Sequence, residues 1–139
     1  MTEKFVFPSE EWVAKYWELL RANDAYKEAA KTWEGDFIFE IQPDGEVITE
    51  KMGMYLDLWH GECREAHMAG PDDDAEYVYT GTYANWKKLI AGEIDPIKGL
   101  MSRKFGLPKG DMGKVMRATK AAAELVSTAQ RVPTKYFDE

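Results

Sequence analysis

The sequence predicts an α+β fold in which helices cover one face of a five-stranded, mainly antiparallel sheet. Three observations predict it. Apolar residues recur at helical spacing up to about residue 35, alternate between residues 37 and 83, and then return to helical spacing. With 139 residues, 45% of them hydrophobic, the chain has the size of one domain with a substantial core.

Two helices are expected ahead of the strands. Ser9 can cap the first, whose helically spaced apolar residues are Trp12, Val13, Tyr16, Trp17 and Leu20. Asn23 and Asp24 interrupt this pattern and can cap a second helix, which Gly35 ends. The apolar residues of the second helix are Tyr26, Ala29, Ala30 and Trp33.

Four strands are expected between residues 37 and 83, and they follow one another as a meander. Phe37, Phe39 and Ile41 alternate with more polar residues, and Pro43-Asp44-Gly45 is a hairpin signal. One face of the second strand carries Met52, Met54, Leu56 and Leu58. The segments ECREAHMA and AEYVYTGTY supply the third and fourth strands, because the turn-forming GPDDD separates them.

The last third of the chain returns to helical spacing. A helix that ends at Gly92 is predicted by Tyr83, Trp86, Leu89 and Ile90. Asp95-Pro96 caps a short helix with Ile97, Leu100 and Met101, and SRKFGLP predicts a fifth strand. A final helix is expected to run from Asp111 to about Arg131, with an apolar stripe formed by Met112, Val115, Met116, Thr119, Ala122, Ala123 and Val126.

The stretch GLPKGDMGK, residues 106–114, resembles a phosphate-binding loop at first sight. A P-loop, however, has a Gly, four residues and then Gly-Lys-Ser/Thr. Pro108 occupies the leading position and lacks an N–H, and Val115 lacks the hydroxyl that would hold Mg²⁺. Asp111 stands where a helix cap belongs, and its carboxylate would repel a phosphate. We therefore expect a strand end and a capped helix here.

Catalytic and metal-binding patterns are weak, so we expect a protein that is not an enzyme and needs no cofactor. His60, Cys63 and His67 suggest zinc, but on a strand His60 points away from the other two, and no fourth ligand has supporting spacing. The run Asp72-Asp73-Asp74 lacks the Gly and Glu of an EF-hand calcium loop. No G-x-S-x-G motif is present.

The net charge of −7 conceals two halves of opposite sign. Residues 1–83 carry 7 Lys/Arg and 19 Asp/Glu, whereas residues 84–135 carry 11 Lys/Arg and 4 Asp/Glu. The basic half is either a solvated surface that the acidic half attracts or a face for anionic partners, and the acidic total disfavours nucleic acid. A single cysteine, no apolar run of membrane-spanning length and no apolar signal core in MTEKFVFPSEE predict a cytoplasmic location.

Residues 79–126, YTGTYANWKKLIAGEIDPIKGLMSRKFGLPKGDMGKVMRATKAAAELV, resemble the sterol carrier protein type 2 (SCP-2) family of lipid-binding domains. The order of parts matches: a Gly-Thr step into the helix with Trp86, then Gly92, the Asp95-Pro96 turn, a short strand and a final helix after Gly110-Asp111. The most specific part is KGDMGKVMR. The likeness spans roughly residues 25–133 of one domain, residues 1–139, with residues 1–24 as an N-terminal helical extension.

The resemblance implies an apolar tunnel between sheet and helices, which binds fatty acyl chains, sterols or other lipids without catalysis. Carried onto this sequence, the expected lining residues are Phe39, Met54, Leu56, Trp86, Ile90, Leu100, Met101, Met112, Val115 and Met116. The aromatic helix from Trp12 to Leu20 departs from the family pattern and could plug or gate the pocket. The terminal residues KYFDE do not match a peroxisomal targeting signal, so the resemblance does not imply a peroxisomal location.

The leading hypothesis is a non-catalytic intracellular carrier of a fatty acid, fatty acyl-CoA or other lipid, and two alternatives stay open. In one, the chain is a structural, dimerising or substrate-presenting module whose pocket is filled by Trp12 and Trp17. In the other, it is an enzyme with His60 or Asp57 as candidates. The expected partners are a lipid, a second copy of the chain, and an anionic membrane contacted through Lys87, Lys88, Arg103, Lys104 and Lys109.

Overall fold

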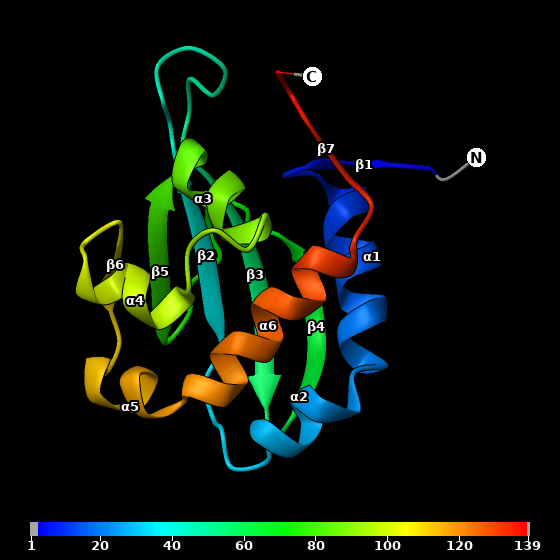
Figure 1. Ribbon diagram of the computed structural model, residues 1–139, viewed down its shortest axis with the longest axis vertical. Helices are drawn as coiled ribbons and strands as arrows, with labels where there is room; N and C mark the ends of the chain where they lie inside the picture. Colours follow the sequence, from blue (N-terminus) through cyan, green and yellow to red (C-terminus); the bar gives the residue numbers. More distant parts are fainter. Residues whose placement is uncertain (1–2, 139) are drawn as a thin grey trace.

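Five strands form the central sheet of the computed structural model, which describes residues 3–138 (Figure 1). The strands are β2 (Phe37–Gln42), β3 (Met52–Trp59), β4 (Glu62–Met68), β5 (Tyr77–Thr82) and β6 (Phe105–Lys109), in the order β4-β3-β2-β5-β6. The β2–β5 pair is parallel and the other three pairs are antiparallel. The predicted α+β class and the mainly antiparallel five-stranded sheet are therefore confirmed.

The prediction that all four consecutive strands form a meander is wrong, because β5 lies beside β2 and not beside β4. Helix α1 (Glu10–Arg21) packs along β4 and binds its backbone. Trp17 Nε1 donates to the carbonyl of Cys63 at 2.6 Å, and the N–H of Met68 donates to the Glu10 carboxylate at 2.8 Å. These bonds and the packing of α1 cover part of this edge of β4. Strand β5 pairs with β2, on the opposite side of the meander.

The remaining helices are α2 (Asp24–Ala29), α3 (Tyr83–Ile90), α4 (Pro96–Met101), α5 (Met112–Arg117) and α6 (Thr119–Arg131), of which α2, α4 and α5 begin at predicted caps. The side chains of Ser9, Asn23, Asp95 and Asp111 each accept hydrogen bonds from backbone N–H groups of the first helical turn. Since Asp111 occupies the N–H groups at the start of α5, the interpretation of GLPKGDMGK as a strand end and a capped helix agrees with the structure.

The single final helix that the sequence predicted is wrong. Its backbone leaves the helical region at Ala118, with φ −89° and ψ 41°, so that α5 and α6 are separate helices. The interruption rotates the buried face of α6, which consists of Ala121, Thr128 and Ala129, while the predicted stripe residues Thr119 and Ala123 are exposed. Helix α6 then runs diagonally across the sheet (Figure 1).

Two further predicted boundaries differ from the structure. Helix α2 ends at Ala29, well before Gly35, because Trp33 turns inward and packs on Phe37 and Tyr77 at centroid distances of 5.8 and 5.0 Å. Strands β2 and β3 are antiparallel neighbours, as the hairpin signal predicted, but residues 43–51 connect them as a long loop and not a tight turn. Asp44 organises this loop by accepting hydrogen bonds from three backbone N–H groups.

The two ends of the described chain form a small parallel pair that the sequence did not predict. Strand β1 (Phe5–Phe7) lies beside β7 (Thr134–Tyr136), and we call this pair the terminal clasp (Figure 1). Trp12 Nε1 donates to Thr134 Oγ1 at 2.9 Å, which ties α1 to the clasp. The N–H of Phe137 donates to the Tyr83 hydroxyl at 3.1 Å, which ties the clasp to α3.

Within residues 3–138, no helix is both long enough and apolar enough to cross a lipid bilayer.

Candidate functional site

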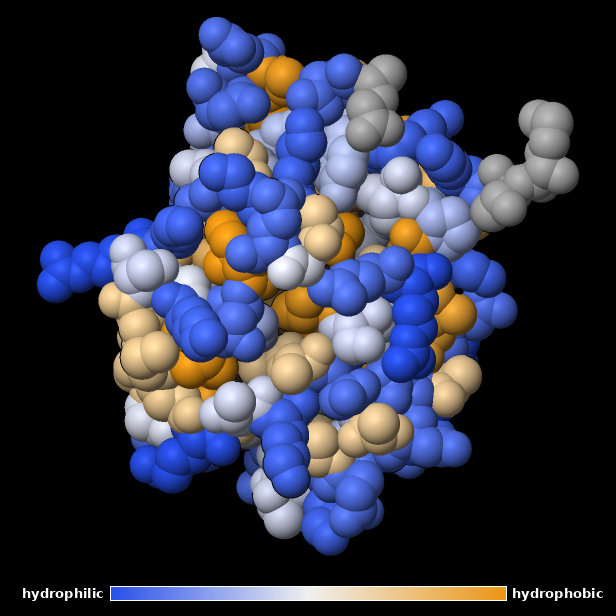
Figure 2. Space-filling model, viewed as in Figure 1, coloured by the Kyte–Doolittle hydropathy of each residue, from blue (hydrophilic) through white to orange (hydrophobic). Residues whose placement is uncertain are grey.

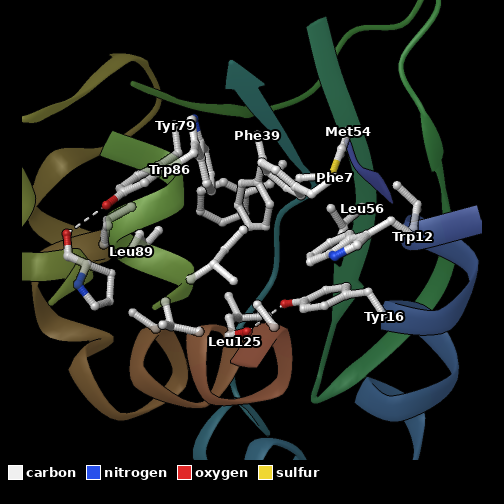
Figure 3. Close-up of a pocket in the computed structure, with 18 of the residues that line it drawn as sticks. Phe7, Trp12, Tyr16, Phe39, Met54, Leu56, Tyr79, Trp86, Leu89 and Leu125 are labelled. Carbon is white, nitrogen blue, oxygen red and sulfur yellow. Dashed lines mark hydrogen bonds between the residues drawn. The ribbon is translucent and has the colours of Figure 1, made fainter. Parts of the chain in front are cut away.

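An apolar cavity lies between the sheet and α6, and we call it the near chamber. It encloses about 750 Å³ of space between its walls, including open space at its mouth. Aromatic side chains from α1, the sheet and α3 converge on it above α6 (Figure 3). Its walls are formed by Phe7, Trp12, Val13, Tyr16, Phe37, Phe39, Met54, Leu56, Tyr79, Trp86, Leu89, Ile90, Pro96, Ile97, Val115, Ala122, Leu125, Val126 and Ala129.

Four of these side chains carry a polar atom, and every one of those atoms is bound to the protein. The hydroxyl of Tyr16 donates to the carbonyl of Leu125 at 2.8 Å, and the hydroxyl of Tyr79 donates to the carbonyl of Pro96 at 2.9 Å (Figure 3). The indole N–H of Trp86 donates to the carbonyl of Glu40 at 2.9 Å, and that of Trp12 donates to Thr134. The near chamber therefore presents no side-chain polar group to a ligand, and it suits an alkyl or other apolar group.

Burial strengthens this apolar character by keeping the ring hydroxyls neutral. Desolvation raises the pKa of Tyr16 and of Tyr79 well above the ordinary value for a phenol. Neither hydroxyl acts as a base or carries charge near neutral pH.

Six of the ten residues predicted to line a tunnel do line the near chamber. They come from β2, β3, α3 and α5 and are Phe39, Met54, Leu56, Trp86, Ile90 and Val115. Figure 3 shows Phe39, Met54 and Leu56 on the sheet side and Trp86 on the α3 side. That these side chains bind a ligand stays a prediction.

The other four predicted residues do not reach the near chamber. Met101 and Met112 are 62% and 43% exposed, since they stand at the end of α4 and the start of α5. Leu100 is buried and Met116 is half-buried, and both pack outside the chamber wall. Met112 and Met116 therefore lie outside the chamber wall, although Val115 of the same helix α5 is part of it.

Sequence patterns missed two parts of the wall. Phe7, which is completely buried, had no helical or alternating pattern around it. Leu125 and Ala129 were not among the predicted stripe residues, although Ala129 follows Ala122 and Val126 at helical spacing. The aromatic pattern of α1 was a usable signal: Trp12 stacks on Tyr16 at 5.3 Å and forms a wall of the chamber.

Helix α1 narrows the near chamber without filling it. Trp12 contributes to the wall, but Trp17 faces β4 through its bond to Cys63 and lies outside the cavity. The alternative of a pocket filled by both tryptophans is accordingly not favoured by the packing.

A second apolar cavity, the far chamber, adjoins the first. Its space amounts to about 300 Å³, open space at its mouth included, and its walls are Tyr26, Trp33, Phe37, Leu58, Val115, Ala118, Ala121, Ala122 and Leu125. Phe37, Val115, Ala122 and Leu125 belong to the walls of both chambers.

The residues considered for zinc binding and catalysis have other partners. His60 sits in a turn at φ 51°, not on a strand, and its Nε2 lies 2.6 Å from the Glu34 carboxylate. Burial raises the pKa of the Cys63 thiol to about 12, so it is a poor nucleophile and metal ligand. Asp57 forms a two-bond ion pair with Arg64 at 3.0 and 3.1 Å. Among the described residues, no three His, Cys, Asp or Glu side chains are placed to hold a metal ion.

The five cations predicted to contact a membrane fall into two groups. Lys87 and Lys109 form ion pairs with Asp138 and Asp74 at 2.7 and 2.6 Å. Lys88, Arg103 and Lys104 are exposed and form no ion pair within residues 3–138.

Comparisons with known proteins agree with this geometry. The family model of the SCP-2 sterol transfer family matches residues 17–123. A crystal structure of a sterol carrier protein 2 is 33% identical to the chain, with a TM-score of 0.84, and the match covers 89% of this chain and 97% of that one. A protein of Thermus thermophilus, described as possibly a sterol carrier protein, is 31% identical with a TM-score of 0.84, covering 97% of this chain and 94% of that one.

Similarity of fold extends to more distant proteins. The sterol carrier protein 2 of Aedes aegypti, solved in complex with palmitate, is 17% identical with a TM-score of 0.55, over 89% of this chain and 98% of that one. No curated protein sequence gives a significant match. The family match across most of the chain, together with the two structures that are more than 30% identical, shows that the chain belongs to the SCP-2 sterol transfer family.

Proposed function

We propose that this chain binds the apolar part of a lipid, such as a fatty acid or fatty acyl thioester, in the near chamber and transfers it without chemical change. The observation that carries the proposal is the chamber wall, in which all four polar side-chain atoms are bound to the protein. Support comes from the Aedes aegypti protein of the same fold, whose structure contains palmitate.

The energetics suit a carrier. Burial of an alkyl chain gains about 0.8 kcal/mol per CH₂ relative to water, so a dozen methylenes offset the cost of association. Relative to a membrane the gain nearly vanishes, because the chain is apolar in both places. A protein with such a chamber holds a lipid in water and returns it to a bilayer.

The charged end of the ligand is expected to stay at the mouth, since the chamber offers it no partner. Figure 2 shows apolar side chains recessed near the middle of the face that carries α6, with hydrophilic side chains around them. Ala122, Leu125 and Val126 line the chamber and are only half-buried, which places part of the opening along α6.

Lipid release and probe displacement test this function. Gently purified protein is expected to release a co-purified lipid on denaturation, detected by mass spectrometry, and to bind a fluorescent fatty acid probe that unlabelled lipid displaces. Ala129→Phe places a ring in the near chamber and is expected to weaken probe binding about tenfold or more, a loss of about 1.4 kcal/mol. Ala123→Phe is the matched control, because Ala123 lies on the same helix and is exposed. The absence of both lipid and displacement across several lipid classes refutes the proposal.

We also propose that the molecule contacts anionic membranes in the cytoplasm through the surface formed by α4, β6 and α5. Exposed Met101 and Met112 lie on these helices, and the exposed cations Arg103 and Lys104 directly follow α4. Figure 2 shows pale orange side chains over this side of the molecule, bordered by blue ones. Cations around exposed apolar groups suit a surface of anionic headgroups. Association of two copies of the chain stays a prediction.

A further inference from the structure

Among the described residues, one buried side-chain polar atom lacks a hydrogen-bond partner, and it belongs to Tyr77. The Tyr77 side chain is completely buried, and no group of residues 3–138 forms a hydrogen bond with its hydroxyl. A buried donor left unpaired costs free energy, so such an atom calls for an explanation. We propose that Tyr77 and Lys114 form a binding site for a carboxylate group. The inference rests on the proposed function, which supplies the carboxylate as the headgroup of a fatty acid.

Neighbouring residues hold the Tyr77 ring in one position. It packs on Trp33 and on Phe37 at centroid distances of 5.0 Å in each case. Two glycines lie against opposite edges of the ring. A Cβ at Gly35 would stand 2.6 Å from Cε1, and a Cβ at Gly110 would collide with Cδ2. The hydroxyl therefore cannot turn away toward another partner within the protein.

Two side chains of opposite charge act on this hydroxyl. Burial raises the pKa of Tyr77, the ammonium group of Lys114 opposes the rise, and the carboxylate of Glu76 adds to it. Both charged side chains are exposed, and neither forms an ion pair within residues 3–138. Near neutral pH the hydroxyl keeps its proton, so it and the ammonium group present two donors to an anion. Glu76 repels an anion, but its exposed side chain can turn toward solvent.

An apolar cavity adjoins this pair of donors. The start of β5, where Tyr77 stands, and helix α5 lie at the same end of the sheet (Figure 1). Lys114 Nζ is 5.8 Å from the centre of the Trp33 ring. Trp33 and Val115, the residue after Lys114, both line the far chamber. A carboxylate held by Tyr77 and Lys114 thus has its first carbons beside Trp33 and an apolar space next to them.

Two ligands that share a tail and differ in charge test the site. We expect Lys114→Met to weaken binding of palmitic acid about fivefold, measured by displacement of a fluorescent fatty acid probe, and to leave methyl palmitate within about twofold. Glu76→Gln removes the opposing charge and is expected to strengthen palmitic acid binding about twofold. The matched control is Lys120→Met, which removes an exposed lysine of helix α6 and is expected to change neither affinity.

Tyr77→Phe removes the hydroxyl and keeps the ring. We expect it to weaken palmitic acid about tenfold, because a hydrogen bond to a charged group is lost. The free energy of unfolding of the ligand-free protein is expected to stay the same or to rise, since the hydroxyl has no partner there. A loss of stability, with both ligands bound as before, would show that the hydroxyl has only a structural role.

The remaining outcomes separate this inference from the proposed function. Equal weakening of palmitic acid and its methyl ester in these variants, or no weakening of the acid, overturns the carboxylate site. Failure of the unchanged chain to bind either ligand refutes the proposed function, and NMR titration with isotope-labelled acetate then tests the site alone. Acetate binding that Tyr77→Phe abolishes would show that the site takes a free carboxylate, whereas no acetate binding overturns the site as well.

Discussion

At the scale of single residues, His67 is a titratable side chain with several defined partners on the sheet. Its ring stacks on Tyr55 at 5.1 Å, and its Nδ1 donates to the carbonyl of Met68 at 2.9 Å. The carboxylates of Glu65 and Asp73 lie 3.2 and 3.7 Å from the ring. The bond to the Met68 carbonyl, followed by the two carboxylates, raises the pKa of His67 above its ordinary value.

This raised pKa predicts a stability contribution that depends on pH. A histidine whose folded pKa exceeds its unfolded value of about 6.5 stabilises the fold fully below that pH and loses the effect as pH rises through the folded pKa. We expect His67→Gln to lower the free energy of unfolding by up to about 1 kcal/mol near pH 5.5, because the site is partly exposed, and by less near pH 8.5.

Urea denaturation at the two pH values measures the His67 effect. Glu65→Gln removes one of the facing carboxylates and is expected to reduce the pH dependence without abolishing it. An equal loss of stability in His67→Gln at both pH values would show that only its packing on Tyr55 matters.

At the scale of elements, the terminal clasp connects both ends of the described chain to the walls of the near chamber. Phe7 of β1 lies 4.8 Å from Trp12 and 6.2 Å from Tyr136, measured between ring centroids. The Trp12–Thr134 hydrogen bond joins α1 to β7, and Trp12 is only 2% exposed. Loss of that acceptor would leave a buried indole N–H without a partner.

We expect Thr134→Val to lower the free energy of unfolding by about 1–3 kcal/mol, because the Trp12 N–H stays buried and unpaired. Chemical denaturation measures the loss. Thr134→Ser keeps an oxygen in the same place and is expected to retain most of the stability. The same loss in both variants would contradict a role for this hydrogen bond in holding the clasp.

At the scale of the whole molecule, part of the basic half of the sequence, namely α4, β6 and α5, lies at one edge of the sheet, while α6 packs on α1 and α2. Helix α1 lies along β4 at one edge, and β6 with α4 and α5 lies at the other. Lys109 and Asp74 join the two halves by an ion pair at 2.6 Å. Lys88, Arg103 and Lys104, in contrast, form no ion pair within residues 3–138. Direct pairing between the halves therefore leaves these three cations available to an anionic partner.

This separation predicts binding to anionic vesicles that depends on salt. Arg103→Gln with Lys104→Gln is expected to weaken sedimentation with phosphatidylserine vesicles about thirtyfold, at about 1 kcal/mol per cation. Binding is also expected to fall between about 0.1 M and about 1 M salt, since the screening length shortens from about 10 to about 3 Å.

The matched control for the vesicle experiment is Lys27→Gln with Lys31→Gln on and just after α2, where both cations have ion-pair partners. This double variant is expected to bind as the unchanged chain does. Vesicle binding that changes neither with the anionic lipid content nor with the salt concentration would contradict the proposed membrane contact.

Local signals in the sequence predicted much of the fold, because helix caps act within a few residues. Ser9, Asn23, Asp95 and Asp111 cap helices as predicted. Contacts between residues far apart in the chain could not be predicted from local sequence patterns. The parallel β2–β5 pair joins strands that are not consecutive in the chain, and the terminal clasp joins strands from the two ends of the described chain.

The candidate site was predictable where a side chain's direction follows from its own element. Phe39, Met54 and Leu56 face the near chamber because strand alternation fixes their side. Met112 and Met116 were misplaced because α5 turns Val115 toward the chamber while Met112, its first residue, is exposed and Met116 packs outside the wall. The hydrophobic pattern is the same for a filled core and for a cavity, so the sequence could not predict the far chamber.

The unequal charge of the two sheet edges makes the molecule an electric dipole directed across the strands. In the field of an anionic surface such a dipole experiences a torque before any contact forms, and it turns the β6 edge toward the surface. Orientation during approach raises the rate of productive encounters more than it raises affinity. Under the proposed membrane contact, the order of strands in the sheet thus bears on how fast the protein docks as well as on how it is built.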